Sequence, residues 1–310
     1  MRPHLIVNPA AADGKTGRHF DAVLRALRNG VGEFDCSFTR RRGDGARLAY
    51  EAARGGAHLV VAVGGDGTAS EVIDGLFTGG ELVSDVTFGF IPRGTGGDLS
   101  RTLAWPADPV AATRILCQGD VRPIDVGRIE FVDVNGRPRI RHFANVAGLG
   151  VSGHVVRVIE RGGKGLGGRT AFMLASARAL LGWRDQPVRW RLDHGPWRED
   201  RVTSICVCNG RFFGGGMMVA PQACVDDGLF DVTVWQGLGL SDFMLKRGML
   251  YDGTHVRLPN TRTFRARVLE AEPVGVPVLL DVDGEQPGML PARFSLLPRA
   301  LPALVAPLGA

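Results

Sequence analysis

Cysteine is sparse in this sequence, and long apolar runs are missing. The 310 residues include 5 cysteines, an odd number with no C-x-x-C pair. This usage favours a reduced, cytoplasmic protein over a secreted one. No stretch approaches the ~18 uninterrupted apolar residues of a membrane-spanning helix, so we expect a chain that is soluble or only peripherally bound to a membrane.

Charge of neither sign dominates the composition. The chain has 37 Lys and Arg residues against 32 Asp and Glu residues, a formal charge of +5. This small basic excess suits contact with a nucleotide, a nucleic acid or an anionic lipid surface, and it does not choose among them.

Glycine, by contrast, is abundant and clustered. The 44 glycines gather at residues 64–67, 94–97, 162–168 and 214–216, where loops can approach a ligand closely. We therefore look for chemistry in these clusters. The length of 310 residues exceeds the usual size of one core and predicts two domains.

The rhythm of the sequence changes near residue 122. Residues 1–122 alternate short apolar strands with helical patterns, which predicts a parallel α/β domain whose loops gather at the carboxyl ends of the strands. Residues 123–310 contain many strand-like segments, including a hairpin turn at Asn135-Gly136, and predict an antiparallel β domain. We expect a cleft between the two domains, and we leave open a return of the C-terminal tail to the first.

The first glycine cluster follows a buried strand and leads directly into a helix. The run Gly64-Gly65-Asp66-Gly67-Thr68 exposes backbone N–H groups at the positive end of that helix, which suits phosphates. A carboxylate at Asp66 is repulsive there unless it binds Mg²⁺, meets a substrate hydroxyl or braces the loop. The alternative is a tight turn with Asp66 as a solvated cap, but a plain turn needs one glycine and not three.

The second cluster repeats this design at the end of the next strand. Gly94, Thr95, Gly96 and Gly97 precede Asp98, which leads a helix. Two such loops at adjacent strand ends can close on one polyphosphate. An ordinary helix capped by Asp98 is the alternative for this second loop. The spacing after Val63 in the first loop does not supply the Rossmann fingerprint G-x-G-x-x-G. The Gly14-Lys15-Thr16 run fails as a P-loop because the first glycine of that motif would fall on Pro9.

Five motifs together carry a resemblance. They are "NP" at 8–9, "GGDGT" at 64–68, "PRGTGGD" at 92–98, "NGRFFGGGMMVAPQACVDDGLFDV" at 209–232 and "DVDGE" at 281–285. In this order and spacing the sequence resembles the diacylglycerol kinase catalytic family, most of all its bacterial lipid kinase branch, which is related to sphingosine and ceramide kinases. "GGDGT" alone also occurs in NAD kinases and phosphofructokinase-like enzymes, and the later elements narrow the choice. The resemblance implies a Rossmann-like parallel α/β domain, a C-terminal antiparallel β-sandwich that holds the lipid, and ATP in the cleft.

The resemblance also implies roles for individual residues. Those implied to contact ATP are Asn8, Pro9, Thr39, Gly64, Gly65, Asp66, Gly67, Thr68, Gly94, Thr95 and Asp98. A structural Mg²⁺ is implied at Asp227, with the backbone carbonyls of Cys224 and Leu229 as further oxygen ligands. The competing interpretation of "DDG" at this point is a plain turn.

The general base implied by the resemblance is Glu285 in "DVDGE", with Asp283 beside it. A solvated hairpin tip is the alternative. An i, i+2 relation would put both side chains on one face if the strand continued, but we expect Gly284 to turn the chain. Asp66 is the third candidate for the catalytic carboxylate.

One position departs from the family pattern. Where the family usually has Asn in a G-T-x-N-D motif, this chain has Gly97, which removes a donor and an acceptor from the nucleotide loop. Three interpretations stay open: a subfamily with a different substrate, a weaker hold on the nucleotide, or a water in place of the amide. We favour the first, because Asp66, Asp98, Asp227 and Glu285 are all present.

Two segments suit a lipid. Arg137, Arg139 and Arg141 share one face of a strand and could contact anionic headgroups, although a solvated sheet face explains them as well. The segment 211–221, "RFFGGGMMVAP", could line an acyl chain, and core packing is its alternative.

The sequence thus predicts an ATP-dependent lipid kinase of phospholipid biosynthesis that uses ATP and Mg²⁺ and phosphorylates a diacylglycerol-, ceramide- or sphingosine-like hydroxyl. An NAD kinase and a non-catalytic lipid or nucleotide sensor of the same fold are the alternatives. We expect a cytoplasmic protein peripheral to the inner face of the membrane that binds no nucleic acid. A homodimer is left open, and the sequence does not name the lipid.

Overall fold

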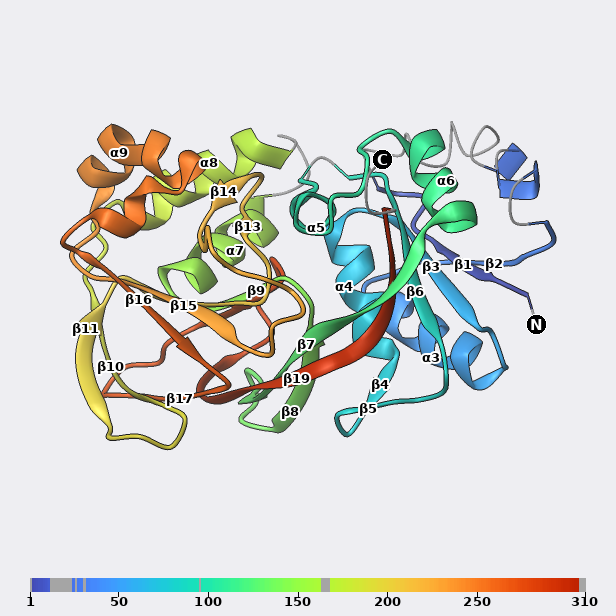
Figure 1. Ribbon diagram of the computed structural model, residues 1–310. Coiled ribbons are helices and arrows are strands. Elements are labelled where there is room, and N and C mark those ends of the chain that lie inside the picture. The colour runs from blue at the N-terminus through green and yellow to red at the C-terminus, as the bar shows by residue number, and fades with distance from the viewer. Residues whose placement is uncertain are drawn as a thin grey trace. The chain divides into compact units, whose positions relative to one another are not determined.

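The chain folds into two compact units. The computed structural model describes residues 2–11, 24–25, 27–29, 32–94, 96–162 and 168–306 (Figure 1). The first unit comprises the chain up to Val126 together with the C-terminal segment from Arg299, and the second runs from Gly127 to Pro298. Among the described residues, no helix is both long and apolar enough to cross a membrane.

The first unit is built on a parallel sheet. Its strands lie in the order β6-β3-β1-β2, and all neighbours are parallel. Their bounds are β1 His4–Val7, β2 Asp35–Phe38, β3 Leu59–Gly64 and β6 Thr87–Pro92. Strand β3 is buried along its whole length, as its run of apolar residues predicts. The end of the last strand, β19 (Met289–Val305), pairs with β6 at Ala303 and Phe88.

Helices follow the strands of the first unit, as its α/β pattern predicts. They are α3 Asp44–Arg54, α4 Asp66–Gly75, α5 Asp98–Thr102 and α6 Pro109–Gln118, with a small hairpin of β4 Phe77–Thr78 and β5 Glu81–Leu82 after α4. Helix α6 shows how local sequence fixes a boundary. Asp108 accepts a hydrogen bond from the Ala111 N–H at 2.7 Å, and Pro109 occupies the first helical position.

The second unit contains two antiparallel sheets. The five-stranded sheet has the order β16-β15-β12-β9-β18, with bounds Thr261–Ala266, Phe230–Trp235, Ser204–Cys208, Val146–Gly150 and Leu280–Val282. The other sheet has β11-β10-β17-β19, where β11 is Arg198–Val202, β10 Gln186–Leu192 and β17 Val268–Pro273. Strand β7 (Asp120–Val132) pairs with β19 and with β8 (Pro138–Phe143).

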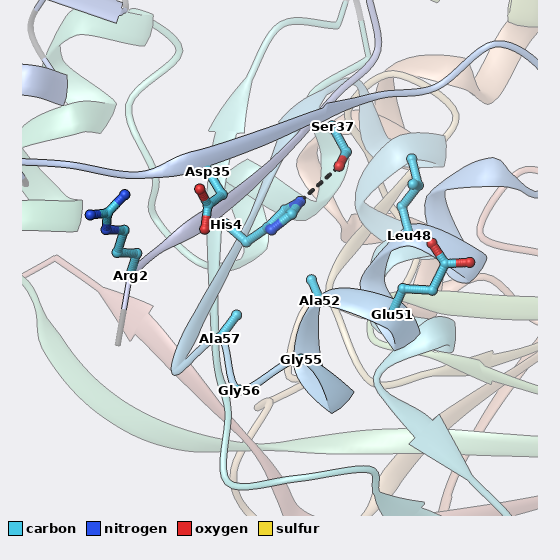
Figure 2. Close-up of a pocket in the computed structure, with 10 residues that line it drawn as sticks. All are labelled: Arg2, His4, Asp35, Ser37, Leu48, Glu51, Ala52, Gly55, Gly56 and Ala57. Atoms are coloured by element: carbon cyan, nitrogen blue, oxygen red, sulfur yellow. Dashed lines mark hydrogen bonds between the residues drawn. The ribbon is translucent and has the colours of Figure 1, made fainter.

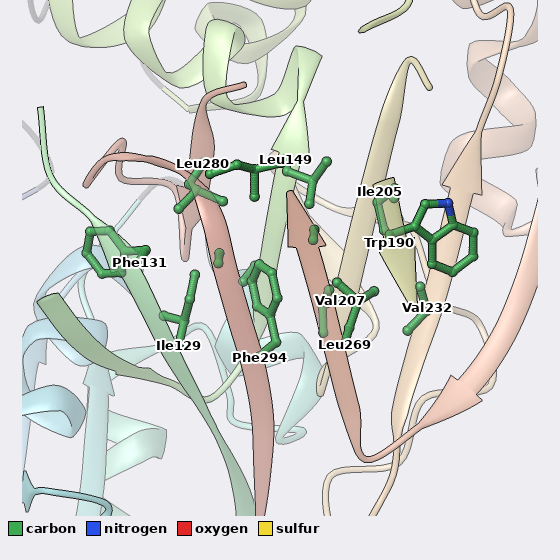
Figure 3. Packing of buried hydrophobic residues seen from close by; sticks show 14 of the residues in the cluster. Ile129, Phe131, Leu149, Trp190, Ile205, Val207, Val232, Leu269, Leu280 and Phe294 are labelled. Carbon is green, nitrogen blue, oxygen red and sulfur yellow. The ribbon is translucent and has the colours of Figure 1, made fainter. Parts of the chain in front are cut away.

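The two sheets of the second unit enclose one apolar core. Trp190, Phe294 and Val207 are among its fully buried members, and they come from three different strands (Figure 3). Along β12 the alternate residues Ile205 and Val207 belong to this core. The second unit is therefore a β-sandwich, as predicted.

Helices cover the other face of the five-stranded sheet. They are α7 Val151–Gly162, α8 Gly168–Leu180 and α9 Leu240–Asp252, which lie together above that sheet in Figure 1 and are followed by the short helix η1, Thr254–Arg257. Cys206 and Cys208 of β12 point into the helix-side cluster, which also contains Met217 and Phe243. A short hairpin, β13 Phe212–Phe213 with β14 Met217–Met218, lies within the same layer.

Candidate functional site

The carboxyl ends of the parallel strands bring the predicted nucleotide residues together in the first unit. The chain places β2 on one side of β1 and β3 on the other, so the strand order reverses between β1 and β3. Open α/β sheets bind ligands at such a switch point. Asn8, which follows β1, donates from Nδ2 to the Thr68 hydroxyl at 3.1 Å across this point. A single hydrogen bond therefore joins two predicted ATP contacts.

Glycine lets the two loops touch through their backbones. A Cβ on Gly94 would lie 2.6 Å from the Cα of Gly65, a distance that real atoms do not adopt. A Cβ on Gly64 would lie 2.4 Å from the Thr68 hydroxyl oxygen. Around Gly67, in contrast, no described heavy atom lies within 4 Å of such a Cβ. Gly67 opens the first turn of α4 to solvent, where the early N–H groups of a helix have no acceptor inside the helix.

Asp66 braces the second loop. Its carboxylate accepts hydrogen bonds from the backbone N–H groups of Asp98 at 3.1 Å and Leu99 at 3.2 Å, at the start of α5. Burial raises the pKa of Asp66, while these amides, the Gly97 amide and the charge of Arg101 act to lower it. Three roles were open to Asp66: binding Mg²⁺, meeting a substrate hydroxyl and bracing the loop. The contacts of its side chain agree with the third, because they hold the second loop at the start of α5. Its catalytic role stays a prediction.

Gly97 and Asp98 form the start of α5. Gly97 has φ +68° and ψ 29°, the left-handed region that glycine adopts freely and that asparagine tolerates best among other residues. The replacement of the family's Asn by Gly97 therefore keeps the backbone conformation and removes only the amide. Asp98 is buried and forms an ion pair with Arg101 at 3.0 Å, and Arg101 also donates to the Gly96 carbonyl.

The remaining predicted ATP contacts lie near the same edge of the sheet or outside the described residues. The Thr39 amide donates to the Val7 carbonyl at 2.9 Å, which holds Thr39 beside the end of β1. Pro9 follows Asn8 and is partly exposed. Thr95 lies outside the residues that the structure describes.

A tight turn positions the candidate bases in the second unit. Val282 and Glu285 exchange both backbone hydrogen bonds, at 2.8 and 3.0 Å, around Asp283 and Gly284. The φ angles of Asp283 and Gly284, +49° and +83°, match the two-residue Asp-Gly hairpin turn. The Asp283 carboxylate accepts from the Val146 N–H at 3.0 Å, so it ties this turn to β9.

Glu285 pairs with an arginine that the sequence assigned elsewhere. The Glu285 carboxylate lies 2.6 Å from the Arg141 guanidinium, and both side chains are largely buried, with exposed fractions of 14% and 16%. Arg139 pairs with Asp133 at 3.1 Å. Two of the three arginines of the predicted basic stripe therefore face carboxylates, and contact of the stripe with anionic headgroups stays a prediction. Arg141 instead fixes the carboxylate of the leading candidate base.

Asp281 lies beside the candidate bases and is not among the residues that the sequence predicted for the site. It lies in β18, is buried, and accepts the Gly284 N–H at 2.9 Å. Burial, the first cause, raises the pKa of Asp281 to about 8, and the charges of Asp283, Glu160 and Glu285 add to the rise. A lone aspartate within the apolar run "VPVLLDV" was the available signal.

A polar cavity in the first unit lies away from the glycine loops. Its volume is about 420 Å³, and its lining includes His4 and Asp35, the first residues of β1 and β2. His4 Nε2 and the Ser37 hydroxyl form a 2.8 Å hydrogen bond inside it (Figure 2). Because ligands of open α/β sheets bind at the carboxyl ends of strands and this cavity lies at the amino ends, we assign it no part in the site.

Comparison with known proteins agrees with this geometry. Residues 2–129 match the family model of the diacylglycerol kinase catalytic domain, and residues 145–305 match the YegS C-terminal NAD kinase beta sandwich-like domain. A diacylglycerol kinase of Bacillus subtilis is 30% identical over 297 residues, which cover 94% of this chain and 92% of the relative. This chain belongs to the diacylglycerol kinase family.

Other known proteins are similar to this chain along nearly its whole length. A protein of Xanthomonas oryzae pv. oryzae, named "Probable lipid kinase YegS-like", is 32% identical over 302 residues, which cover 96% of this chain and 94% of that protein. The crystal structure of a diacylglycerol kinase from Bacillus anthracis str. Sterne has a TM-score of 0.74 at 25% identity and covers 100% of this chain and 98% of its own. The yeast NADH kinase, at 12% identity and a TM-score of 0.54, covering 99% of this chain and 84% of its own, shares the fold alone.

The family resemblance also implied a metal at Asp227. In the structure both oxygens of the Asp227 carboxylate already have partners within the chain. One Asp227 oxygen accepts the Leu229 N–H at 3.1 Å, and the other pairs with Arg265. The Cys224 thiol donates to Asp226 at 2.9 Å. No group of three or more His, Cys, Asp or Glu side chains suited to a metal occurs in the described part of the chain. In this arrangement the side chain of Asp227 does not fit a cation unless Arg265 is displaced, and the metal site stays a prediction.

Proposed function

We propose that this protein transfers the γ-phosphoryl group of ATP to the hydroxyl of a lipid such as diacylglycerol, ceramide or sphingosine. The observation that carries the proposal is the contact of two glycine loops, through Gly65 and Gly94, at the switch point of the parallel sheet. Such a cradle of backbone amides suits a polyphosphate. The kinase family of this chain supports a phosphoryl donor of that type.

The first unit would bind and orient the nucleotide. The first turn of α4, open at Gly67, would supply N–H groups to the phosphates, while Asn8 and Thr68 would hold the neighbouring edge. Asp66 would keep α5 in place through the amides of Asp98 and Leu99. A Mg²⁺ ion that arrives with ATP would neutralise phosphate charge. Catalysis would then be mostly positioning and electrostatic stabilisation.

The second unit would supply the base. In the reaction the bond between the γ-phosphorus and the ADP oxygen breaks, the lipid oxygen bonds to that phosphorus, and the hydroxyl proton moves to a carboxylate. We propose Glu285 for this role, because Asp283 is committed to the Val146 amide. Arg141 would hold the Glu285 carboxylate in place. A carboxylate in such a role contributes ~10²–10⁴ in rate.

A lipid acceptor would also determine the metabolic role of the enzyme and where in the cell it acts. A phosphorylated lipid is an acidic precursor of phospholipids, so the activity would belong to phospholipid biosynthesis. An acceptor embedded in a bilayer requires the enzyme to bind peripherally at the membrane surface, and in a cytoplasmic enzyme that is the inner face. A homodimer stays a prediction.

An acceptor panel tests the proposal. The purified protein is incubated with labelled ATP and vesicles that contain diacylglycerol, ceramide or sphingosine, and separately with NAD. We expect label in one of the lipids and none in NAD. Label in NAD alone would make the protein an NAD kinase, and ATP binding without transfer to any acceptor would make it a sensor.

A further inference from the structure

Two helices of the second unit carry large apolar side chains on their outward faces. The exposed fractions are 58% for Leu174 and 72% for Leu181 on α8, and 50% for Met244 and 85% for Leu245 on α9. The Leu181 N–H still donates to the Ala177 carbonyl, so Leu174 and Leu181, seven residues apart, share one face of a continuous helix. Large apolar side chains gathered on neighbouring exposed helices indicate an interaction surface.

Basic side chains lie among these apolar ones. Arg178 is exposed and stands four residues after Leu174, on the same face, and α8 contains no acidic residue. Arg247 is exposed on α9, next to Lys246, which is itself paired with Asp242 at 2.7 Å. Within the described ranges, no carboxylate pairs with Arg178 or Arg247. The surface therefore combines aliphatic side chains with two uncompensated positive charges.

An apolar cavity lies between the two helices. Its volume is about 390 Å³, and it is lined by Thr170 and Met173 of α8 and by Arg247, Gly248 and Tyr251 of α9. The cavity thus opens beside one of the two arginines. A hydrocarbon chain would find apolar walls there, with a positive charge beside it for its headgroup.

The inner side of α8 is apolar as well. Phe172 packs against Phe213 with ring centroids 5.8 Å apart, and a Cβ on Gly214 would lie 2.5 Å from the Phe172 ring. The glycine-rich segment 211–221, which contains two Phe and two Met side chains, therefore packs against the inner side of α8. Apolar side chains therefore lie on both the inner and the outer side of α8, and no described part of the chain covers the outer ones, Leu174 and Leu181.

We propose that the outward faces of α8 and α9 form the surface by which this protein docks on an anionic bilayer. Leu174, Leu181 and Leu245 enter the acyl region, while Arg178 and Arg247 contact lipid phosphates. The cavity between the helices receives an acyl chain. This inference rests on the proposed function, since an enzyme with a lipid acceptor must reach the bilayer in which that acceptor lies. A second copy of the chain fits less well, because a two-fold interface on this face would bring the arginines of one copy toward those of the other.

Vesicle binding without ATP tests the docking surface separately from catalysis. The full chain is mixed with vesicles of phosphatidylcholine and phosphatidylglycerol, and the bound fraction is measured by flotation. We expect the double variant Leu181→Asp, Leu245→Asp to bind about a hundredfold more weakly, from roughly tenfold for each leucine. The matched control is Val134→Asp, which places the same charge on a side chain that is 67% exposed in another part of the second unit.

Charge and oligomeric state complete the test. Arg178→Gln with Arg247→Gln should weaken binding and reduce its dependence on the anionic lipid. A short-chain, water-soluble acceptor should be phosphorylated by the leucine variant as fast as by the parent, whereas failure of the proposed function would remove activity from both and leave vesicle binding unchanged. Equal binding by parent and leucine variant, equal loss in Val134→Asp, or conversion of a dimer to a monomer by the leucine changes would each overturn the proposal.

Discussion

The glycines of the two loops at the switch point of the parallel sheet have two different structural roles. Gly64 and Gly94 are required by the fold, because a side chain on either would strike Thr68 or the backbone of Gly65. Gly67 is not required in this way, since its Cβ would point into open space. A substitution at Gly67 therefore separates nucleotide binding from folding.

We expect Gly67→Val to lower ATP affinity at least roughly tenfold, because its side chain occupies the approach of the phosphates to α4. The melting temperature should stay near that of the parent, as valine is no worse than glycine within a helix. Gly94→Ala should lower the melting temperature. Calorimetric titration and thermal unfolding measure the two effects, and unchanged ATP affinity in Gly67→Val would place the nucleotide elsewhere.

The identity of the base is a second question at this scale. Glu285→Gln should lower turnover about a hundredfold or more and leave ATP affinity nearly intact. Asp283→Asn should be close to the parent in turnover, because asparagine tolerates a positive φ and its side-chain oxygen can still accept the Val146 N–H. Normal turnover in Glu285→Gln together with a dead Asp283→Asn would assign the base to Asp283 instead.

Single residues also show where prediction from the sequence reached its limit. The glycine loops were recognisable because local spacing determines a turn. The partners of Asp66 and Glu285 were not, because each contact joins residues far apart in the chain, 32 positions for Asp66 and Asp98 and 144 for Arg141 and Glu285. The sequence listed bracing among three roles of Asp66 and placed Arg141 on a surface stripe. The fold supplies the contacts of these side chains, and the catalytic roles of Asp66 and Glu285 stay predictions.

Strand β18 and its turn form an element whose stability should depend on pH. The folded chain keeps the proton of Asp281 up to a pKa of about 8, whereas an unfolded aspartate loses it near pH 4. Unfolding therefore releases a proton between these values, and the free energy of unfolding falls as the pH rises through that window.

Asp281→Asn should remove this dependence, because the amide keeps the acceptor for the Gly284 N–H and cannot ionise. Between about pH 5 and about pH 8 the parent should lose several degrees of melting temperature more than the variant. Thermal unfolding across this range measures the difference. Parallel curves for the two proteins would mean that Asp281 is already ionised in the fold.

At the turn that contains Asp227, competition between Arg265 and Mg²⁺ for one carboxylate can be tested. Arg265 of β16 occupies the carboxylate that the family resemblance assigns to Mg²⁺. Since two cations compete for one carboxylate, Mg²⁺ should raise the melting temperature of Arg265→Gln by a few degrees more than that of the parent. Asp227→Asn should abolish the response in both backgrounds. Equal stabilisation of parent and Arg265→Gln would show that arginine and metal do not compete.

Elements were predictable where their signal was local. The strands and helices of the first unit follow from apolar runs, helical periodicity and caps such as Asp108. The two-residue strands β13 and β14 and the 17-residue strand β19 were not foreseen. Strand β19 pairs with β6 through Ala303 and Phe88, which lie far apart in the sequence. A local sequence pattern does not predict which distant strand will be the partner.

The whole molecule divides its chemistry between two units. The first has a parallel sheet whose glycine loops suit a polyphosphate, and the second has a β-sandwich with a carboxylate turn and an apolar helix layer. The fold class was predictable because the two halves of the sequence have different periodicities. The cleft between them stays a prediction.

The transfer of a labelled phosphoryl group tests the central claim most directly. The protein is incubated with diacylglycerol, ceramide or sphingosine vesicles and ATP labelled in either the γ- or the α-phosphate, and the lipids are then extracted. The account predicts that γ-label enters the lipid fraction, that α-label does not, and that Glu285→Gln lowers the rate about a hundredfold or more. γ-Label that appears only as inorganic phosphate or in NADP, with no labelled lipid, would contradict it.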